Sequence, residues 1–199
     1  MTAVHLFTAL FALFVSGEAA FSWKSCAPAG SPIHVESIQV GPDPVEVPGD
    51  MVLSLSGTSS APIGSSSLTI SAKRKTFLLE IPIPCINHIG SCTYDDICGL
   101  PDKMIAEDWL GVAAGLGQQI KAMLNSSGVD ACPIPAQTLT VSNAHIHIPS
   151  LPSALAVFAA GDYHINLNLV DNASHQTTLC IDIMVTIHEP CSGLSCLFG

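Results

Sequence analysis

Alternation of apolar and polar residues along several segments is the feature that most limits how this 199-residue chain folds. The longest runs place apolar residues at Tyr163, Ile165, Leu167 and Leu169, and at Leu179, Ile181, Ile183, Val185 and Ile187. Shorter runs of the same period surround Leu55 and Ile70. Because successive side chains of a strand point to opposite faces, these runs are typical of half-buried antiparallel strands. The sequence therefore predicts an all-β protein built from two sheets packed face to face.

One segment departs from this period and predicts an amphipathic helical insertion. From Asp102 to Leu124 the apolar residues recur every three or four positions, at Ile105, Trp109, Ala113, Leu116, Ile120 and Leu124. Glycines at 111, 115 and 117 weaken a helix here. Such a helix could cap a cavity, touch a membrane or simply pack its apolar stripe on the sheet.

The first twenty residues predict a signal peptide that is removed from the mature protein. The apolar run from Leu6 to Val15 is followed by the small residues Gly17, Ala19 and Ala20. The alternative of an uncleaved anchor is disfavoured, because a membrane span needs about 20 apolar residues. We expect residues 21–199 to form a single domain in the secretory pathway.

The chain contains eight cysteines, at positions 26, 85, 92, 98, 132, 180, 191 and 196. An even number in a secreted chain predicts a disulfide framework, although the count alone leaves about 105 connectivities open. The spacings include no CxxC pair, and His145 and His147 on one strand face lack a third ligand, so we expect no metal site. Two sequons predict glycosylation at Asn125 and Asn172.

Charge and motifs exclude several classes of function. Six basic residues against sixteen acidic ones give a net charge of −10, which makes nucleic acid an unexpected partner. The sequence contains no GxSxG, HExxH or P-loop motif, and Gly115-Leu116-Gly117 lacks the third glycine of a dinucleotide site. We therefore expect a non-enzymatic protein without catalytic residues or a cofactor.

Two features favour lipid as the ligand. The apolar run Ala154–Ala160 directly precedes a predicted turn at Gly161-Asp162. Lys73, Arg74 and Lys75 lie beside Phe77, Leu78 and Leu79, a combination that suits an anionic lipid surface. The alternative is that the apolar run is buried and that the basic triplet is a solvated hairpin end.

Several motifs resemble the ganglioside activator family, the non-enzymatic cofactors of lysosomal β-hexosaminidase. The similarity lies in the segment Gly-Pro-Asp-Pro-Val-Glu-Val-Pro-Gly at 41–49 and in a cysteine cluster formed by Ile83-Pro84-Cys85, residues 89–94 and Cys98. Weaker pieces extend the match in order from Phe21 to about Ile187.

The resemblance implies an open β-sandwich or β-cup with an apolar lipid cavity, as in the lipid-recognition superfamily. It implies the disulfides Cys26–Cys180, Cys85–Cys92 and Cys98–Cys132, which leaves Cys191 and Cys196 to close a C-terminal extension. It further implies a protein that extracts a glycosphingolipid from membranes and presents it to a hydrolase such as β-hexosaminidase.

The sequence departs from the family pattern at the expected cavity mouth. Ala154 and Glu80 stand where the family has aromatic residues, and the segment between Cys98 and Cys132 is longer. We expect other apolar side chains to contact lipid or membrane instead, namely Leu78, Leu79, Trp109, Leu155, Val157 and Phe158. Lys73, Arg74 and Lys75 are the predicted contacts to an anionic headgroup.

These inferences predict a lipid-transfer protein of the lysosome or the extracellular space that contacts membranes transiently. An alternative within the same fold is a secreted carrier of a sterol, a fatty acid or a microbial lipid. A hydrolase with its own catalytic site and a purely structural secreted protein are the remaining alternatives.

Overall fold

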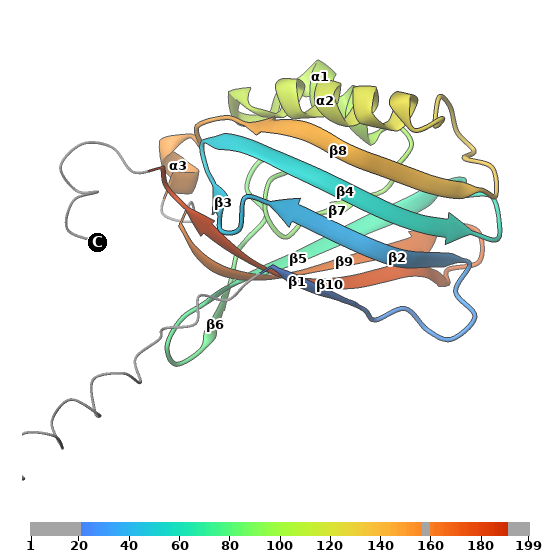
Figure 1. The fold of residues 1–199 in the computed structure, drawn as a ribbon, viewed down its shortest axis with the longest axis horizontal. Helices are drawn as coiled ribbons and strands as arrows, with labels where there is room; N and C mark the ends of the chain where they lie inside the picture. Colours follow the sequence, from blue (N-terminus) through green and yellow to red (C-terminus); the bar gives the residue numbers. More distant parts are fainter. Residues whose placement is uncertain (1–20, 157–159, 191–199) are drawn as a thin grey trace, which may run out of the picture.

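The computed structural model describes residues 21–156 and 160–190 (Figure 1). The predicted signal peptide, Val157, Phe158, Cys191 and Cys196 lie outside these residues. The elements are β1 (Ser22–Ser25), β2 (Ile33–Gly41), β3 (Val45–Glu46), β4 (Gly49–Ser59), β5 (Ser66–Lys75), β6 (Glu80–Pro82), β7 (Thr93–Tyr94), α1 (Leu100–Glu107), η1 (Trp109–Gly111), α2 (Ala113–Ser126), β8 (Thr138–Ile148), α3 (Ser153–Ala156), β9 (Gly161–Asp171) and β10 (Thr177–His188).

The strands form two sheets that face each other (Figure 1). The larger sheet has the order β1-β10-β9-β5-β6, with β3 paired to β10 and β7 paired to β5. The smaller sheet has the order β2-β4-β8. Neighbouring strands run antiparallel except for the short parallel pairing of β3 with β10. The predicted mainly β architecture of two open sheets is confirmed.

The segments that alternate in sequence are central strands of these sheets. The runs around Leu167 and Ile183 form β9 and β10, which pair with each other, while those around Leu55 and Ile70 lie in β4 and β5. Alternation gives β9 an inner face with Tyr163 and Leu169 buried, and an outer face with His164 and Asn166.

The helical segment is correctly located but differs in form from the single helix that its apolar stripe predicts. Asp108, Leu110 and Gly111 have φ values of 40°, 54° and 73°, so α1 ends and the chain turns back into α2. The two helices pack closely because Gly117 is buried against α1, where a Cβ atom would lie 2.8 Å from the Pro101 carbonyl oxygen. This glycine therefore serves helix packing.

Helix α2 lies along the free edge of β8 (Figure 1). The Gln119 side-chain amide pairs with the backbone of His147: its Oε1 accepts from the His147 N–H at 2.6 Å, and its Nε2 donates to the His147 carbonyl at 3.1 Å. The helix thus provides hydrogen-bond partners for backbone groups at the edge of β8, which would otherwise be free to pair with another strand.

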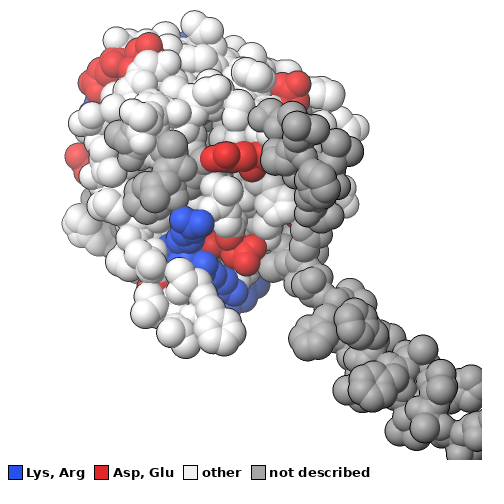
Figure 2. Space-filling model, turned by 90° about the vertical axis from the view of Figure 1, so that its left-hand side faces the viewer, with Lys and Arg blue, Asp and Glu red and all other residues white. Residues whose placement is uncertain are grey.

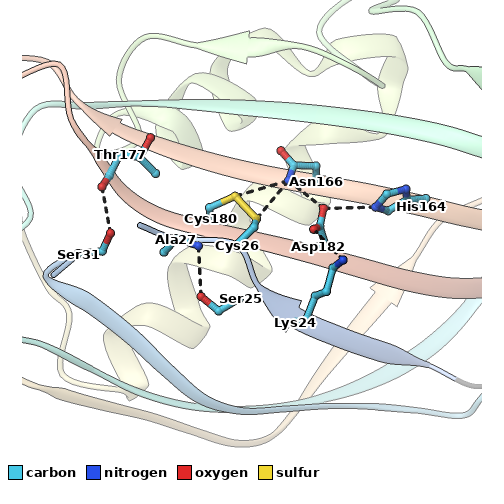
Figure 3. The surroundings of a disulfide bond; sticks show 10 residues. All are labelled: Lys24, Ser25, Cys26, Ala27, Ser31, His164, Asn166, Thr177, Cys180 and Asp182. Atoms are coloured by element: carbon cyan, nitrogen blue, oxygen red, sulfur yellow. Dashed lines mark hydrogen bonds and ion pairs between the residues drawn. A yellow bond between two sulfur atoms is a disulfide. The ribbon is translucent and has the colours of Figure 1, made fainter. Parts of the chain in front are cut away.

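Three disulfides agree with the pairing that the family resemblance implies. They join Cys26 to Cys180, Cys85 to Cys92 and Cys98 to Cys132. The first attaches the end of β1 to β10 across a sequence separation of 154 residues (Figure 3).

A small packed cluster fills the inner space at one end of the sandwich. Ala72, Ile83 and Tyr163 are buried there, with Ile165, Val185 and Ile187 packed against them. The Tyr163 hydroxyl is buried without a hydrogen-bond partner among the described residues, and burial raises its pKa while the charge of Arg74 opposes that rise.

Candidate functional site

A cavity of about 440 Å³ lies between the two sheets, beneath α2. Its volume is in the range of about 300–1,000 Å³ that is common for small-molecule sites. Its walls are mostly apolar, and both sheets and α2 contribute to them through Leu55, Leu124, Leu139, Leu169, Leu179 and Ile181. Such a space can hold a hydrocarbon group away from water.

Polar and charged residues occupy another part of the lining. Asp102 on α1 and Lys121 on α2 form an ion pair of 2.6 Å, with 65% and 50% of their side-chain surfaces exposed. His34, Asn125 and Asp130 also line the cavity and are exposed. Because these groups reach solvent, they mark a polar rim over the apolar walls.

Gln137 is a polar residue among those that line the cavity. Its side-chain nitrogen Nε2 is buried and donates to no acceptor among the described residues. It follows the segment that enters β8, and Pro135 and Leu139, two residues to either side, also line the cavity. The sequence analysis missed this residue, although the spacing of 135, 137 and 139 by two is a signal that predicts one shared face.

The most exposed apolar surface lies at the opposite end of the strands. Between β5 and β6 the chain turns through Thr76–Leu79, where Phe77, Leu78 and Leu79 are 99%, 83% and 58% exposed. The turn is held by Thr76, whose N–H and hydroxyl both donate to the Leu79 carbonyl, at 2.9 and 2.7 Å. Figure 2 views this end and shows lysine and arginine side chains gathered beside uncharged protruding ones. We call residues 76–79 the hairpin tip.

The three basic residues next to the tip do not share one face. They occupy successive positions at the end of β5, so Arg74 points to the side opposite Lys73 and Lys75. Lys73 lies 3.2 Å from Glu80 on β6, whereas the Arg74 guanidinium lies against Gly161 at the start of β9. Their predicted contact with a headgroup stays a prediction.

Comparison with known proteins identifies the family. The chain is 30% identical over 149 residues to the ganglioside GM2 activator of Mus musculus, a match that spans 73% of this chain and 71% of the mouse protein. The chain belongs to the ganglioside GM2 activator family. The corresponding protein of Macaca fascicularis is 29% identical, over 73% of this chain and 72% of that protein.

Two further comparisons concern family models and solved structures. No family model matches the sequence. A crystal structure of a Niemann-Pick type C2 protein from the Japanese carpenter ant has a TM-score of 0.44 at 13% identity, covering 84% of this chain and 99% of that one.

Two other predicted lipid contacts of this family member are buried. Trp109 is 7% exposed and stacks on His88 and Tyr94, with ring centroids 4.8 and 5.8 Å away, while its Nε1 donates to Glu107 at 2.7 Å. Leu155 on α3 is 5% exposed. Neither lines the cavity described above, and their roles toward lipid stay predictions.

The two predicted glycosylation sites differ in their surroundings. Asn172 is held by its side chain, which donates to the Ser65 hydroxyl and the Asp95 carbonyl and accepts from Ser67. A glycan on this nitrogen would replace one of its two N–H groups, so one of these two donated hydrogen bonds would be lost. Asn125 is exposed at the cavity rim, where its amide reaches the carbonyl groups of Lys121 and Val129.

A polar network crosses the outer face of the larger sheet, from β1 to the base of the hairpin. It runs from Lys24 through Asp182 and His164 to Glu80 and Lys73. The pKa of Asp182 is lowered, mainly by the hydrogen bond from Asn166 (Figure 3). The hydrogen bond with His164 and the charge of Lys24 act in the same direction, whereas burial raises this pKa. The hydrogen bond from Lys73 is the main cause that lowers the pKa of Glu80.

Among residues 21–156 and 160–190, no three His, Cys, Asp or Glu side chains come together in a metal-binding arrangement. His147 instead pairs with Asp50 at 2.8 Å on the exposed side of β8. In the same part of the chain, every helix falls short of the length and apolar character that crossing a membrane requires.

Proposed function

We propose that this protein binds the hydrocarbon part of a lipid in the cavity between its sheets and transfers it through water. The observation that carries the proposal is the apolar cavity of about 440 Å³ in a member of the ganglioside GM2 activator family. Each methylene group removed from water contributes about 0.8 kcal/mol, so a long chain gains many kilocalories in a dry cavity.

The hairpin tip is the proposed membrane contact. Phe77 and Leu78 are almost fully exposed, and Thr76 holds the turn that presents them. Insertion of these side chains among lipid tails recovers roughly 1.5–3 kcal/mol for each one buried. Lys73, Arg74 and Lys75 at the base of the tip add attraction to anionic headgroups.

The ligand that best suits the family is a glycosphingolipid such as a ganglioside, with its sugars outside the cavity and available to a hydrolase such as β-hexosaminidase. The relatives that carry the name ganglioside GM2 activator support this finer proposal. Delivery to the lysosome or release from the cell follows from the predicted signal peptide and suits the three disulfides.

Acidic conditions should strengthen binding to anionic vesicles. Without the predicted signal peptide the chain has fifteen acidic and six basic residues and is negative at neutral pH, and protonation of its seven histidines and of some carboxylates reduces that charge. Equal vesicle binding at neutral and acidic pH would contradict this part of the proposal.

Lipid extraction is the direct test. The protein is mixed with ganglioside-containing vesicles at acidic pH, the vesicles are removed, and lipid in the soluble protein fraction is measured. We expect a stoichiometric complex for the native protein. Soluble protein without any lipid would contradict the proposed function.

A matched pair of variants connects extraction to the cavity. Leu139→Trp places a large side chain into the lining, whereas Thr140→Trp places the same group on the exposed side of β8. We expect the first to abolish extraction and the second to leave it unchanged. Equal extraction by both variants would rule out this cavity as the binding site.

A carrier of another lipid is the second candidate, because apolar walls accept a sterol or a fatty-acid chain as well. Mass spectrometry of lipids that co-purify with the protein separates the two. If a sterol or fatty acid is retained and ganglioside is not extracted, the lipid-binding proposal stands and the ganglioside assignment fails.

A further inference from the structure

His164 on β9 lies between two carboxylates that belong to different strands. Its Nε2 lies 3.2 Å from Asp182 Oδ1 on β10 (Figure 3), and its Nδ1 lies 3.5 Å from Glu80 Oε1 on β6. All three side chains are partly buried, with 29% of His164, 17% of Asp182 and 35% of Glu80 exposed. Water therefore screens these contacts less than it screens ion pairs on an open surface.

The charge state of the imidazole decides how many of these contacts are hydrogen bonds. A neutral ring carries one N–H, so one nitrogen donates while the lone pair of the other faces a carboxylate oxygen. A protonated ring donates from both nitrogens and attracts both carboxylates. Protonation of His164 therefore completes a bridge from β6 through β9 to β10.

The charged side chains around this bridge balance one another among the described residues. They lie on the same outer face of five strands and comprise Lys24, Lys73, Lys75, Asp162, Asp182 and Glu80. Hydrogen bonds from Asn166 and Lys73 are the main causes that lower the pKa of Asp182 and of Glu80, respectively. Both carboxylates thus stay charged in mildly acidic solution, where histidine gains its proton.

The strand that gains an additional attachment from the bridge is β6, which follows the hairpin tip. Its three residues, Glu80–Pro82, are all exposed, and it pairs with β5 at the edge of the sheet. Pro82 has no N–H to donate to this pairing. The hairpin projects from the body of the sandwich (Figure 1). The contact of Glu80 with His164 reaches across β5 and connects the base of the hairpin to the centre of the sheet.

We propose that protonation of His164 fixes the base of the hairpin to β9 and β10, and so strengthens binding of the hairpin tip to an anionic membrane in acidic conditions. A tip that is already held in place loses less conformational freedom when it binds. This inference rests on the proposed membrane contact and adds the residue that regulates it.

The test measures binding to vesicles of phosphatidylcholine and phosphatidylserine at about pH 5 and pH 8, at constant ionic strength. The native protein is compared with His164→Gln, whose side chain is uncharged at both pH values. His147→Gln is the matched control. His147 also pairs with a carboxylate, that of Asp50 at 2.8 Å, but it lies on β8 in the other sheet. The two variants therefore remove the same titratable group from the net charge.

For the native protein we expect tighter binding at pH 5 than at pH 8. In His164→Gln the ratio of the two affinities should fall about three- to tenfold, as expected for the loss of one partly exposed hydrogen bond to a charged group. At pH 8 this variant should bind like the native protein. His147→Gln should keep most of the native ratio.

Hydrogen exchange detects the bridge in the absence of a membrane. The Thr76 N–H donates to the Leu79 carbonyl, and the Ile83 N–H donates to the Ala72 carbonyl, both at 2.9 Å. After correction for the intrinsic rate, these amides should be more protected at pH 5 than at pH 8 in the native protein. The increase should be absent in His164→Gln. Glu80→Gln removes the β6 carboxylate and should abolish it as well, which gives a second variant should His164→Gln fold poorly.

The outcomes separate this inference from the function on which it rests. If the native protein binds the vesicles at neither pH, the proposed membrane contact fails. If it binds them and His164→Gln keeps the native ratio, only the role of His164 fails. An equal fall in His147→Gln would assign the effect to net charge and overturn the inference. A fall in His164→Gln without any change in amide protection would overturn it too, because the hairpin would not be fixed by the bridge.

Discussion

The two ends of the sandwich differ in where their apolar side chains lie. At the hairpin end, Phe77 and Leu78 are exposed, while Ala72, Ile83 and Tyr163 pack together behind them. At the other end, Leu139, Leu169 and Ile181 line the cavity. One end therefore presents apolar side chains to the outside, and the other arranges them around an internal cavity.

The same long strands connect these ends. Leu68 pairs with Leu169 of the cavity wall, and Lys75, seven residues further along β5, borders the hairpin tip. At about 3.3 Å per residue, the tip begins roughly 20 Å from the cavity wall. A lipid that first meets the tip has to pass the buried cluster or travel outside it. We therefore predict that membrane contact and lipid binding can be separated by substitutions at the two ends.

The largest difference between the ends should appear when their disulfides are removed. Cys98–Cys132, beside the cavity, closes a separation of 34 residues, and Cys85–Cys92, near the hairpin, closes only 7. Since a cross-link restricts the unfolded chain more for a longer loop, we expect losses of about 4 and about 2 kcal/mol in the free energy of unfolding. Denaturant titration of the paired Cys→Ser variants measures both, and equal losses would contradict the loop argument.

The hairpin tip should control membrane binding without affecting stability. Replacing Phe77 and Leu78 by serine removes two side chains that are 99% and 83% exposed. We expect vesicle binding to fall at least about a hundredfold, since burial of the two side chains in lipid contributes at least roughly 3 kcal/mol in total. The free energy of unfolding should stay within about 0.5 kcal/mol of the native value.

The control for the tip exchanges the two residues, Phe77→Leu with Leu78→Phe, and preserves the apolar area. It should bind vesicles nearly as well as the native protein. Both tip variants should still bind a water-soluble short-chain amide in the cavity. Loss of that binding in the serine variant would contradict the separation of the two ends.

A smaller change in the free energy of unfolding is expected for substitutions of glycine in α2, which contributes to the cavity lining. In Gly117→Ala the new Cβ lies 2.8 Å from the Pro101 carbonyl oxygen, so α1 and α2 have to separate. We expect a loss of about 1–2 kcal/mol in the free energy of unfolding. In Gly115→Ala the added group meets no atom within 4 Å among the described residues, and the better helix propensity should stabilise by up to about 1 kcal/mol. Thermal denaturation of the pair checks this, and the same sign for both would refute the packing role of Gly117.

The smallest effect is a pH dependence on the outer face. Hydrogen bonds from Asn166 and His164 and the charge of Lys24 lower the pKa of Asp182 below its ordinary value of 3.8. A lowered pKa in the folded state means that the stabilisation is complete above 3.8 and is lost as the pH falls through the folded pKa. We expect Asp182→Asn to be less stable than the native protein near neutral pH.

The difference between the native protein and Asp182→Asn should disappear in strong acid, where both side chains are uncharged. Asn166→Ala removes the main cause of the pKa shift and should reproduce part of the same profile. The free energies of unfolding of these proteins are measured from neutral pH to strong acid. A difference between the native protein and Asp182→Asn that stayed constant over this range would contradict the prediction.

Much of the fold could be predicted from local patterns. Alternation located β4, β5, β9 and β10, and it correctly grouped Leu169 with the inner residues of β9 and Leu179 with Ile181 on β10. The family motifs implied three cysteine pairs that the structure contains. Strand patterns depend on near neighbours, and the cysteine pairs follow from motifs that resemble a known family, which is why a sequence reveals both.

The candidate site was harder to predict. Trp109 continues a helical stripe in sequence, yet the chain turns at Asp108 and Leu110, so the indole stacks on His88 and Tyr94. The basic triplet looks like one patch, but its strand geometry separates Arg74 from its neighbours. Gln137 looks like an ordinary loop residue in the sequence, and only the folded chain brings it into one cavity lining with Leu169 and Ile181.

The sequence by itself thus determined the strand faces, the helical region and the candidate disulfide framework. Only the tertiary structure decided where the apolar residues of both sheets leave a cavity, and that the chain buries the side-chain nitrogen of Gln137, one of the lining residues. The physical reason is that periodicity depends on residues a few positions apart. A cavity, by contrast, depends on how closely segments such as β4, β8, β9 and α2 approach one another, and that distance is set by the packing of the whole chain.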